Sequence, residues 1–200
     1  MSEEPASEPT RPVRRLRRAE RREQILDAAT RAFARSGFAG TGLDDVAAEA
    51  GITRVLLYRH FDSKADLYRA VLDRACERLQ RSVGSDEFDD RAIPALLNAA
   101  AADPDAFRLL FRHTAREPEF RDLIDELTTA AVGIARANLA DHVPEGPWLA
   151  WAAQLLPALT VEAVISWLDA GCPDPDDAAR RITHAVHGVI AAAQPDPPTR

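Results

Sequence analysis

Few residues in this sequence support a disulfide framework, a β-sheet or a secretory leader. The 200 residues include only two cysteines, Cys76 and Cys172, far apart in the chain, so we expect free thiols and no disulfide. The start MSEEPASEPT is acidic and polar and has no apolar core, so we expect neither a signal peptide nor a membrane anchor there. Alternating runs of β-branched residues are missing, and no segment requires a strand. With 46% hydrophobic residues, the chain can bury a sizeable core, and we expect a soluble, all-α protein. The free thiols and the polar start indicate a cytoplasmic location.

Recognisable catalytic motifs are also lacking. The sequence contains no nucleophile elbow, no glycine-rich phosphate loop and no paired His and carboxylate in a known motif, so we expect no enzyme and no cofactor. His184 and His187, with Cys172 upstream, have a spacing that is poor evidence for a metal site. We therefore expect no metal.

The net charge of −7 is unevenly distributed along the chain. Residues 1–81 carry fifteen Arg and Lys64 against thirteen acidic residues, a net charge of +3, whereas residues 82–200 carry nine Arg against nineteen acidic residues, a net charge of −10. A basic run, RPVRRLRRAERR, fills residues 11–22 after a start rich in Pro, Glu and Ser. We expect a disordered start and a basic N-terminal part joined to an acidic body.

Apolar residues recur at helical spacing, and Pro or Gly residues separate the helical segments. In the first helix Ile25, Ala29 and Phe33 share one face, and Gly37 ends the pattern near residue 36. Later helices are expected at about 64–81, 91–102, 104–116, 118–142, 147–170 and 174–193. The boundaries that follow are a disordered basic arm at 1–19, a first helical unit at 20–66, a helical body at 67–193 and a disordered tail at 194–200.

The segment from Gly37 to Lys64 predicts two short helices joined by a tight turn. An apolar series at helical spacing stops at Gly51, which permits the turn, and Thr53 can cap a second helix that carries Leu57 and Phe61 inward. This is the layout of a helix-turn-helix, whose second helix lies in the major groove of DNA.

These residues make the chain resemble the tetracycline-repressor (TetR) family. The resemblance covers roughly residues 20 to 75, with the family's residues in the correct order and spacing. They are Ala32, Phe33, Gly37, Phe38, Val46, Ala47, Ala50, Gly51, Leu57, Tyr58, His60, Phe61 and Lys64. The resemblance implies an operator-binding regulator, usually a repressor. Residues 20–66 would form its three-helix DNA-binding domain, and residues 67–193 a helical bundle for effector binding and dimerisation.

The resemblance also implies which side chains contact DNA. Phosphate contacts are expected from Thr41, Tyr58, His60 and Lys64, and base contacts from Thr53, Arg54, Val55 and Leu56. Arg54 is the side chain among them that could grip a guanine through O6 and N7.

The sequence departs from the family pattern at Gly42, Val55 and Leu56. A Thr or Ser usually caps the second helix at the position of Gly42, and a small residue often precedes a Thr or Ser at the positions of Val55 and Leu56. We expect at least one of Val55 and Leu56 to face the groove, where an apolar group can meet a thymine methyl; the alternative is that both pack inward.

Four arginines precede the first helix or begin it: Arg14, Arg15, Arg17 and Arg18. As a flexible arm they would enter a minor groove and add salt-dependent affinity. Alternatively they extend the first helix into solvent, balanced by Glu20 and Glu23. We favour DNA contact, because four such charges are costly to hold together without an anionic partner.

Residues 148–168 are nearly apolar on all sides, which raises the question of a membrane span. Gln154, Pro157, Glu162 and Ser166 interrupt the run and no basic flank anchors it, so we expect a buried helix and no membrane. The family resemblance implies that the last two helices pair with those of a second copy, giving a homodimer.

A second group of side chains mixes aromatic rings with a few polar groups and suits an effector cavity. Its members are Phe107, Phe111, Arg112, His113, Phe120, Trp148, Trp151, Gln154, Glu162 and Trp167. The alternative is that the aromatic residues form core. Glu162 needs a partner inside its apolar helix, and His184, His187 or a dimer contact could supply one.

The sequence therefore predicts a TetR-like homodimeric repressor that a small apolar or amphipathic effector releases from double-stranded operator DNA. A non-specific architectural DNA-binding protein and an all-helical enzyme that retains the helix-turn-helix are the alternatives.

Overall fold

The computed structural model describes residues 17–84, 91–114 and 117–195, and every regular element within them is helical. The all-α prediction is confirmed. The helices are α1 (Arg18–Gly40), α2 (Leu43–Glu49), α3 (Arg54–Tyr58), α4 (Lys64–Val83), α5 (Ala92–Ala102), α6 (Pro104–Arg108), the π-helical turn η1 (Leu109–His113), the 3₁₀ turn η3 (Pro118–Phe120), α7 (Arg121–Leu139), α8 (Pro147–Asp169) and α9 (Pro175–Ala193). Arg14 and Arg15 of the predicted basic arm lie outside the described residues.

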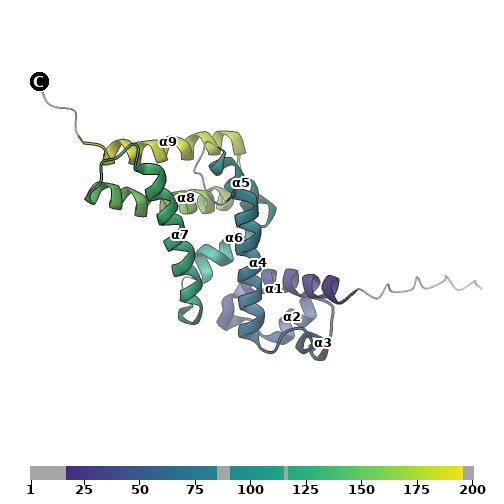
Figure 1. Cartoon of the computed structure of the whole chain (residues 1–200). Coiled ribbons are helices and arrows are strands. Elements are labelled where there is room, and N and C mark those ends of the chain that lie inside the picture. Colours follow the sequence, from purple (N-terminus) through teal and green to yellow (C-terminus); the bar gives the residue numbers. More distant parts are fainter. Residues whose placement is uncertain (1–16, 85–90, 115–116, 196–200) are drawn as a thin grey trace, which may run out of the picture.

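Helices α1, α2 and α3 form the N-terminal unit, with α3 at one end of the molecule and α9 at the other (Figure 1). Gly51 takes a positive φ of 63° in the turn between α2 and α3, which explains the glycine there. The Thr53 hydroxyl accepts a hydrogen bond from the Leu56 N–H and caps α3, as the sequence predicts. At the head of α2, where the family usually has Ser or Thr, the Asp45 carboxylate instead accepts from the Gly42 N–H at 2.8 Å.

Helix α4 connects the N-terminal unit to the body (Figure 1). Its first half, including Leu67 and Leu72, is buried in the same core as α1–α3. Leu79, near its end, packs against both this core and the second core of the molecule. The boundary at residue 66 remains a prediction, and the packing makes α4 a shared element of both units.

The second core lies between α5, α7, α8 and α9. Helices α8 and α9 form an antiparallel pair, and α7 packs against α8 at a steep angle (Figure 1). By length and composition alone α8 could cross a membrane, a test that core helices of soluble proteins also pass. Here its Ala152, Leu156, Val164 and Ile165 side chains are buried against the neighbouring helices.

The helix expected at 104–116 changes its winding after Arg108. Residues Leu109–His113 form a π-helical turn, an arrangement that inserts extra backbone into a helix and is common at functional positions. The Thr114 hydroxyl donates to the Leu109 carbonyl at 2.7 Å, which stabilises this wide turn. Periodicity alone does not separate the two windings over so short a segment.

A buried guanidinium fastens α4 to α1. Arg74 donates to the carboxylates of Glu23 (3.1 Å) and Asp27 (2.7 Å) and to the Thr30 hydroxyl (3.0 Å). Its side chain is 10% exposed, whereas the two carboxylates are half exposed. The contact fixes α4 against the N-terminal unit.

Replacing Arg74 with Met should lower the free energy of unfolding by about 1–3 kcal/mol, because a buried charged donor with three partners is lost. Urea unfolding followed by circular dichroism measures this. Arg78→Met is the matched control: Arg78 also pairs with Glu23, but its side chain is 43% exposed, so its loss should cost less than about 1 kcal/mol. Equal losses in the two variants would contradict a special role for Arg74.

Candidate functional site

Helix α3 presents a short outward face. Leu57 is fully buried and anchors the helix, Val55 is 67% exposed and Tyr58 is 44% exposed. Leu56 is half-buried. Of Val55 and Leu56, Val55 is thus the one that faces solvent. The Val55 side chain therefore forms an apolar tip on α3, beside the polar groups of Arg54 and Tyr58.

Arg54 is held in place at the first turn of α3. Its guanidinium pairs with Asp44 of α2 at 2.8 Å and donates to the Tyr58 hydroxyl at 3.2 Å. It also lies over the Tyr58 ring, 5.6 Å from its centre. The Tyr58 hydrogen bond and the Asp44 charge raise the pKa of Arg54 further above its ordinary value, so the group is a permanent cation. The ion pair is solvent-exposed, so a stronger acceptor can replace Asp44.

His60 lies beneath the start of α1. Partial burial lowers the pKa of this imidazole below 6.5, and the charges of Arg18, Arg22 and Arg21 lower it further. Arg22 also lies over the Phe61 ring, 4.8 Å from its centre. The first turns of α1 therefore place a group of cations beside the end of α3.

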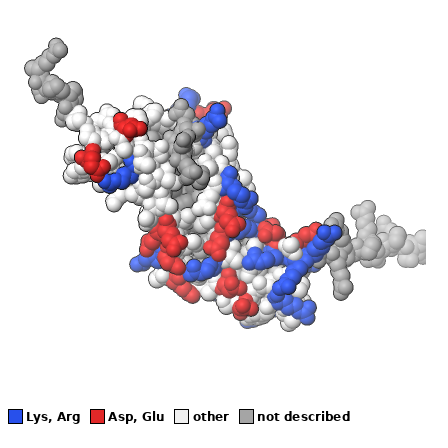
Figure 2. Space-filling view, in the orientation of Figure 1, with Lys and Arg blue, Asp and Glu red and all other residues white. Residues whose placement is uncertain are grey.

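Arg21 and Arg22 were missing from the predicted contact set, although they belong to the basic run at 11–22 that the sequence displays. Arg17 and Arg18 are exposed at the same end of α1, and the Arg17 N–H donates to Glu20 at 2.8 Å. Arg14 and Arg15 lie outside the described residues. Figure 2 shows Lys and Arg side chains gathered over this end of the molecule, while the opposite end is mostly uncharged on this face.

Two of the predicted phosphate contacts are instead structural. Thr41 is 2% exposed, and its hydroxyl donates to the Gly37 carbonyl at 2.8 Å, which closes the junction between α1 and α2. The Lys64 ammonium donates to the carbonyls of Phe38 (2.7 Å) and Thr41 (3.1 Å) and lies over the Phe38 ring. Both side chains face inward because the kinked end of α1 leaves carbonyls that need donors. Both groups are therefore engaged within the free chain, and their contact with phosphate remains a prediction.

The predicted effector residues do not converge on one cavity. Phe120 is buried in a ring cluster with Phe38 and Tyr68, at 5.0 and 4.6 Å between ring centres. Trp148 and Trp151 are exposed at the start of α8. The prediction placed these residues together because periodicity gives a face for each helix and not the distance between helices.

The other predicted effector residues are also dispersed. Trp167 is buried and donates from Nε1 to the Pro173 carbonyl at 2.6 Å. Gln154 and Glu162 are exposed on α8, and His113 is half-buried. The structure gives Glu162 no ion pair with a described residue, so pairing with His184 or His187 inside one chain is wrong. Arg112, together with Arg108, pairs with Asp169 at the end of α8, and these contacts lower the pKa of Asp169.

A cavity of about 210 Å³ lies between α4, α5, α7 and α8. Phe111 is the predicted residue that lines it, and Phe107 lies behind it at 4.8 Å between ring centres. The remaining walls come from residues that the sequence analysis did not single out: Leu79, Gln80, Val83, Gly84, Ala92, Leu96, Leu127, Ala130, Ala131, Ile134, Pro157, Thr160 and Val161. Their only signal in the sequence is the apolar face of each helix. We call this the α4-side cavity.

A second cavity of about 200 Å³ lies between α5, α7, α8 and α9. Its lining includes Asn138, His142, Thr183 and His187 among apolar side chains. We call it the α9-side cavity.

Metal chemistry has no support in the described ranges. The His, Cys, Asp and Glu side chains there form no group of three or more that could hold a metal ion. Burial raises the pKa of the Cys76 thiol to about 11, so it remains protonated, while Cys172 is exposed.

Comparison with known proteins agrees with this geometry. Residues 25–71 match the family described as bacterial regulatory proteins, tetR family. The transcriptional activator FasR of Mycolicibacterium smegmatis is 31% identical over 175 residues, which cover 82% of this chain and 80% of FasR. The transcriptional repressor SCO4008 of Streptomyces coelicolor is 39% identical over 89 residues, which cover 44% of this chain and 46% of the repressor.

The fold has close counterparts among solved structures. A TetR-like transcriptional regulator from Rhodococcus sp. RHA1 superposes with a TM-score of 0.77 at 22% identity, over 88% of this chain and 99% of that one. The identity to FasR extends through both the N-terminal unit and the body. The helix-turn-helix, the helical body and these similarities together place this chain in the TetR family of transcriptional regulators.

Proposed function

We propose that this regulator binds a specific operator as a homodimer, with α3 in the major groove, and that a small effector releases it. The observation that carries the proposal is the outward face of α3, where Arg54, Val55 and Tyr58 lie next to the cations of the first turns of α1. A guanidinium and an apolar tip on the helix can both contact base edges, and phosphate contacts beside the helix fix its position on the duplex.

In this proposal Arg54 contacts a base edge, and neighbouring side chains hold its guanidinium in position before DNA binds. Asp44 and Tyr58 hold its guanidinium at the face of α3, so less side-chain freedom is lost on binding. Val55 contacts a thymine methyl, and Thr53 and Leu56 border the same groove. Tyr58, His60, Arg17, Arg18, Arg21 and Arg22 contact phosphates, and Arg14 and Arg15 extend the basic arm.

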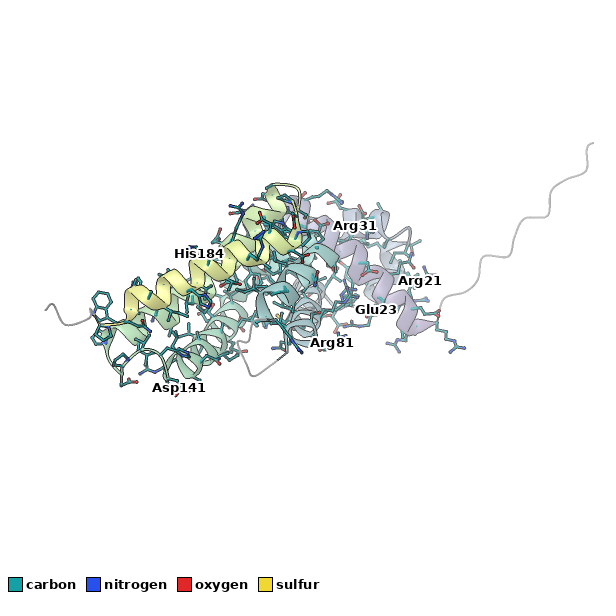
Figure 3. All side chains as sticks on the ribbon, turned by 90° about the horizontal axis from the view of Figure 1, so that it is seen from above. Arg21, Glu23, Arg31, Arg81, Asp141 and His184 are labelled. Carbon is teal, nitrogen blue, oxygen red and sulfur yellow. The ribbon has the colours of Figure 1, made fainter. Side chains whose placement is uncertain are left out.

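The proposed homodimer uses the outer faces of α8 and α9. Figure 3 shows α9 on the outside of the body, with His184 on it, far from Arg21 at the start of α1. The exposed positions of α9 include the small residues Ala185, Gly188 and Ala192, which allow close approach of a second helix. Glu162 of α8 lies exposed beside this face, where a partner helix would meet it.

The effector is proposed to act through Phe111. This side chain lines the α4-side cavity, and the adjacent Leu109 and Leu110 of η1 are buried in the core of the N-terminal unit. The Tyr68 hydroxyl of α4 meets the Thr114 hydroxyl after η1 at 3.2 Å. A ligand that displaces Phe111 therefore moves a turn that contacts both α1 and α4, and a rigid α4 passes the shift to α3.

We also propose that the protein acts in the cytoplasm as a repressor. A dimer that occupies an operator can block transcription without contacting polymerase, so the repressor needs no further surface. A promoter–reporter fusion tests the direction: deletion of the regulator should raise expression, and a fall on deletion would make the protein an activator.

Fluorescence anisotropy on DNA from upstream of its own gene, against a scrambled duplex at two salt concentrations, tests the DNA-binding part. Preferential binding that persists at the higher salt supports a specific regulator. Equal binding to both duplexes that salt abolishes would favour the architectural alternative, and turnover of a substrate without DNA binding would favour the enzyme.

Arg54→Ala should reduce discrimination between operator and scrambled DNA by about 1–3 kcal/mol, because the proposed bidentate base contact is lost. Anisotropy titrations of both duplexes measure the ratio of dissociation constants. Arg81→Ala is the control, since it removes the same charge from an exposed position near the end of α4. If Arg54→Ala weakened both duplexes equally, Arg54 would be a phosphate contact.

DNA binding should strengthen as the pH falls through the range in which His60 titrates. In the free protein the lowered pKa keeps this imidazole neutral at pH 7. A phosphate beside it stabilises the protonated form and raises the pKa in the complex, so binding takes up a proton between the two pKa values. Affinity should rise up to about tenfold per pH unit within that interval.

Anisotropy titrations between pH 8 and pH 5.5 measure this dependence. His60→Gln should flatten it, whereas His142→Gln, at the far end of the body, should leave it unchanged. An identical pH profile for His60→Gln would remove His60 from the contact set.

Gly188→Arg should convert the dimer to a monomer, because the new side chain would occupy the proposed contact between α9 helices. A Cβ at Gly188 meets no atom within 4 Å in one chain, so the protomer itself should fold. Gly133→Arg is the matched control, since Gly133 lies equally free on α7. Light scattering after gel filtration gives the masses; a Gly188→Arg dimer would exclude this face.

A further inference from the structure

The two cavities of the body lie end to end along α7. Ala131 and Ile134 line the α4-side cavity, and Ala135 and Leu139 line the α9-side cavity. Pro157 of α8 lines both, so they meet at this residue. Proline has no backbone N–H. Pro157 therefore adds no hydrogen-bond donor that an apolar ligand chain would leave without a partner.

The lining chemistry differs between the two cavities. The α4-side cavity is walled mainly by Leu, Ile, Val, Ala and Phe side chains. Of its polar members, Thr160 donates its hydroxyl to the Leu156 carbonyl at 2.8 Å, and Gln80 is exposed at the edge. This cavity suits an apolar group that needs no hydrogen bond.

The α9-side cavity offers hydrogen-bond donors on one side. Thr183 and His187, one turn apart on α9, line it, and neither has a side-chain hydrogen bond to a described residue. A hydroxyl and an imidazole each carry a donor in every neutral form. Asn138 already donates to the Ile134 carbonyl at 2.8 Å, and the His142 ring lies 3.3 Å from the Asn138 carbonyl. The donors without a partner among the described residues are thus those of α9 and the second Nδ2–H of Asn138.

Size points to one occupant for both cavities. Pockets for drug-sized ligands enclose roughly 300–1,000 Å³. The cavities of about 200 and 210 Å³ each fall short of that range, and joined at Pro157 they reach it. The shared wall runs along α7 from Leu127 to Leu139, a length of about 18 Å at the helical rise. Such a site is long and narrow.

We propose that a single elongated amphipathic ligand occupies both cavities. Its apolar chain lies in the α4-side cavity against Phe111, and its head, a hydroxyl or carboxyl group, accepts hydrogen bonds from Thr183 and His187. This inference rests on the proposed function, because it names the chemical class and the orientation of the effector.

Isothermal titration calorimetry of the full-length protein with straight-chain fatty acids, from hexanoic to tetradecanoic acid and below their micelle concentrations, tests the inference. The matching alcohols are titrated in parallel. We expect one molecule per protomer and an affinity that rises with chain length until both cavities are filled.

Three variants localise the ligand. Ala131→Leu fills the α4-side cavity and should abolish binding of the long chains. Thr183→Val combined with His187→Ala removes the donors and should weaken the long acids by about tenfold or more while leaving the gain per methylene unchanged. Ala137→Leu, on the exposed face of α7, is the matched control and should bind as the parent does.

Other outcomes overturn the inference. Two molecules per protomer, or short acids whose binding depends on α9 but not on Ala131, would mean two separate sites. No binding by any acid or alcohol, in protein that still binds its operator, would reject the ligand class and leave the proposed DNA binding intact. Binding of one molecule with no change in DNA affinity would retain the site and reject its role as the effector site.

Discussion

The ring cluster of Phe33, Phe38, Tyr68 and Phe120 joins the two halves of this molecule. Phe33 and Phe38 belong to the end of α1, Tyr68 to α4 and Phe120 to η3 before α7. Phe33, Tyr68 and Phe120 are fully buried, and Phe38 is partly buried. Close-packed interiors have low compressibility, so a displacement of one ring is passed to the others. A shift of α4 therefore reaches α1 through this cluster and through the Arg74 contact. Both depend on α4, which belongs to two cores at once.

The N-terminal unit could be predicted in detail from the sequence because its elements are short and its end signals are local. Gly51 and Thr53 fix the turn and the cap of α3 by their own conformations and hydrogen bonds, without help from distant residues. The exposure of Val55 follows from the burial of Leu57, since a helix of five residues has a single inward face. Here local chemistry decides the structure.

The body could be predicted only as a set of helices. Which faces enclose a cavity depends on how α4, α5, α7 and α8 cross, and residues such as Trp148 and Phe111 have the same periodic signal whether they lie at a cavity or at a solvent-exposed end. The structural roles of Thr41 and Lys64 were missed for a related reason. Their polar groups satisfy carbonyls freed where α1 kinks at Gly37, and a kink of that kind is a tertiary feature.

The position of Lys64 has a consequence for how this protein can be controlled. It is the one lysine of the sequence, and its ammonium is bound to two main-chain carbonyls. All other permanent cations are guanidinium groups, which stay protonated throughout the biological pH range. Acetylation of lysine, which cells use to cancel positive charge, therefore has almost nothing to act on here. Release by a change of shape, as proposed for the effector, therefore leaves the positive charge of the DNA-facing surface intact.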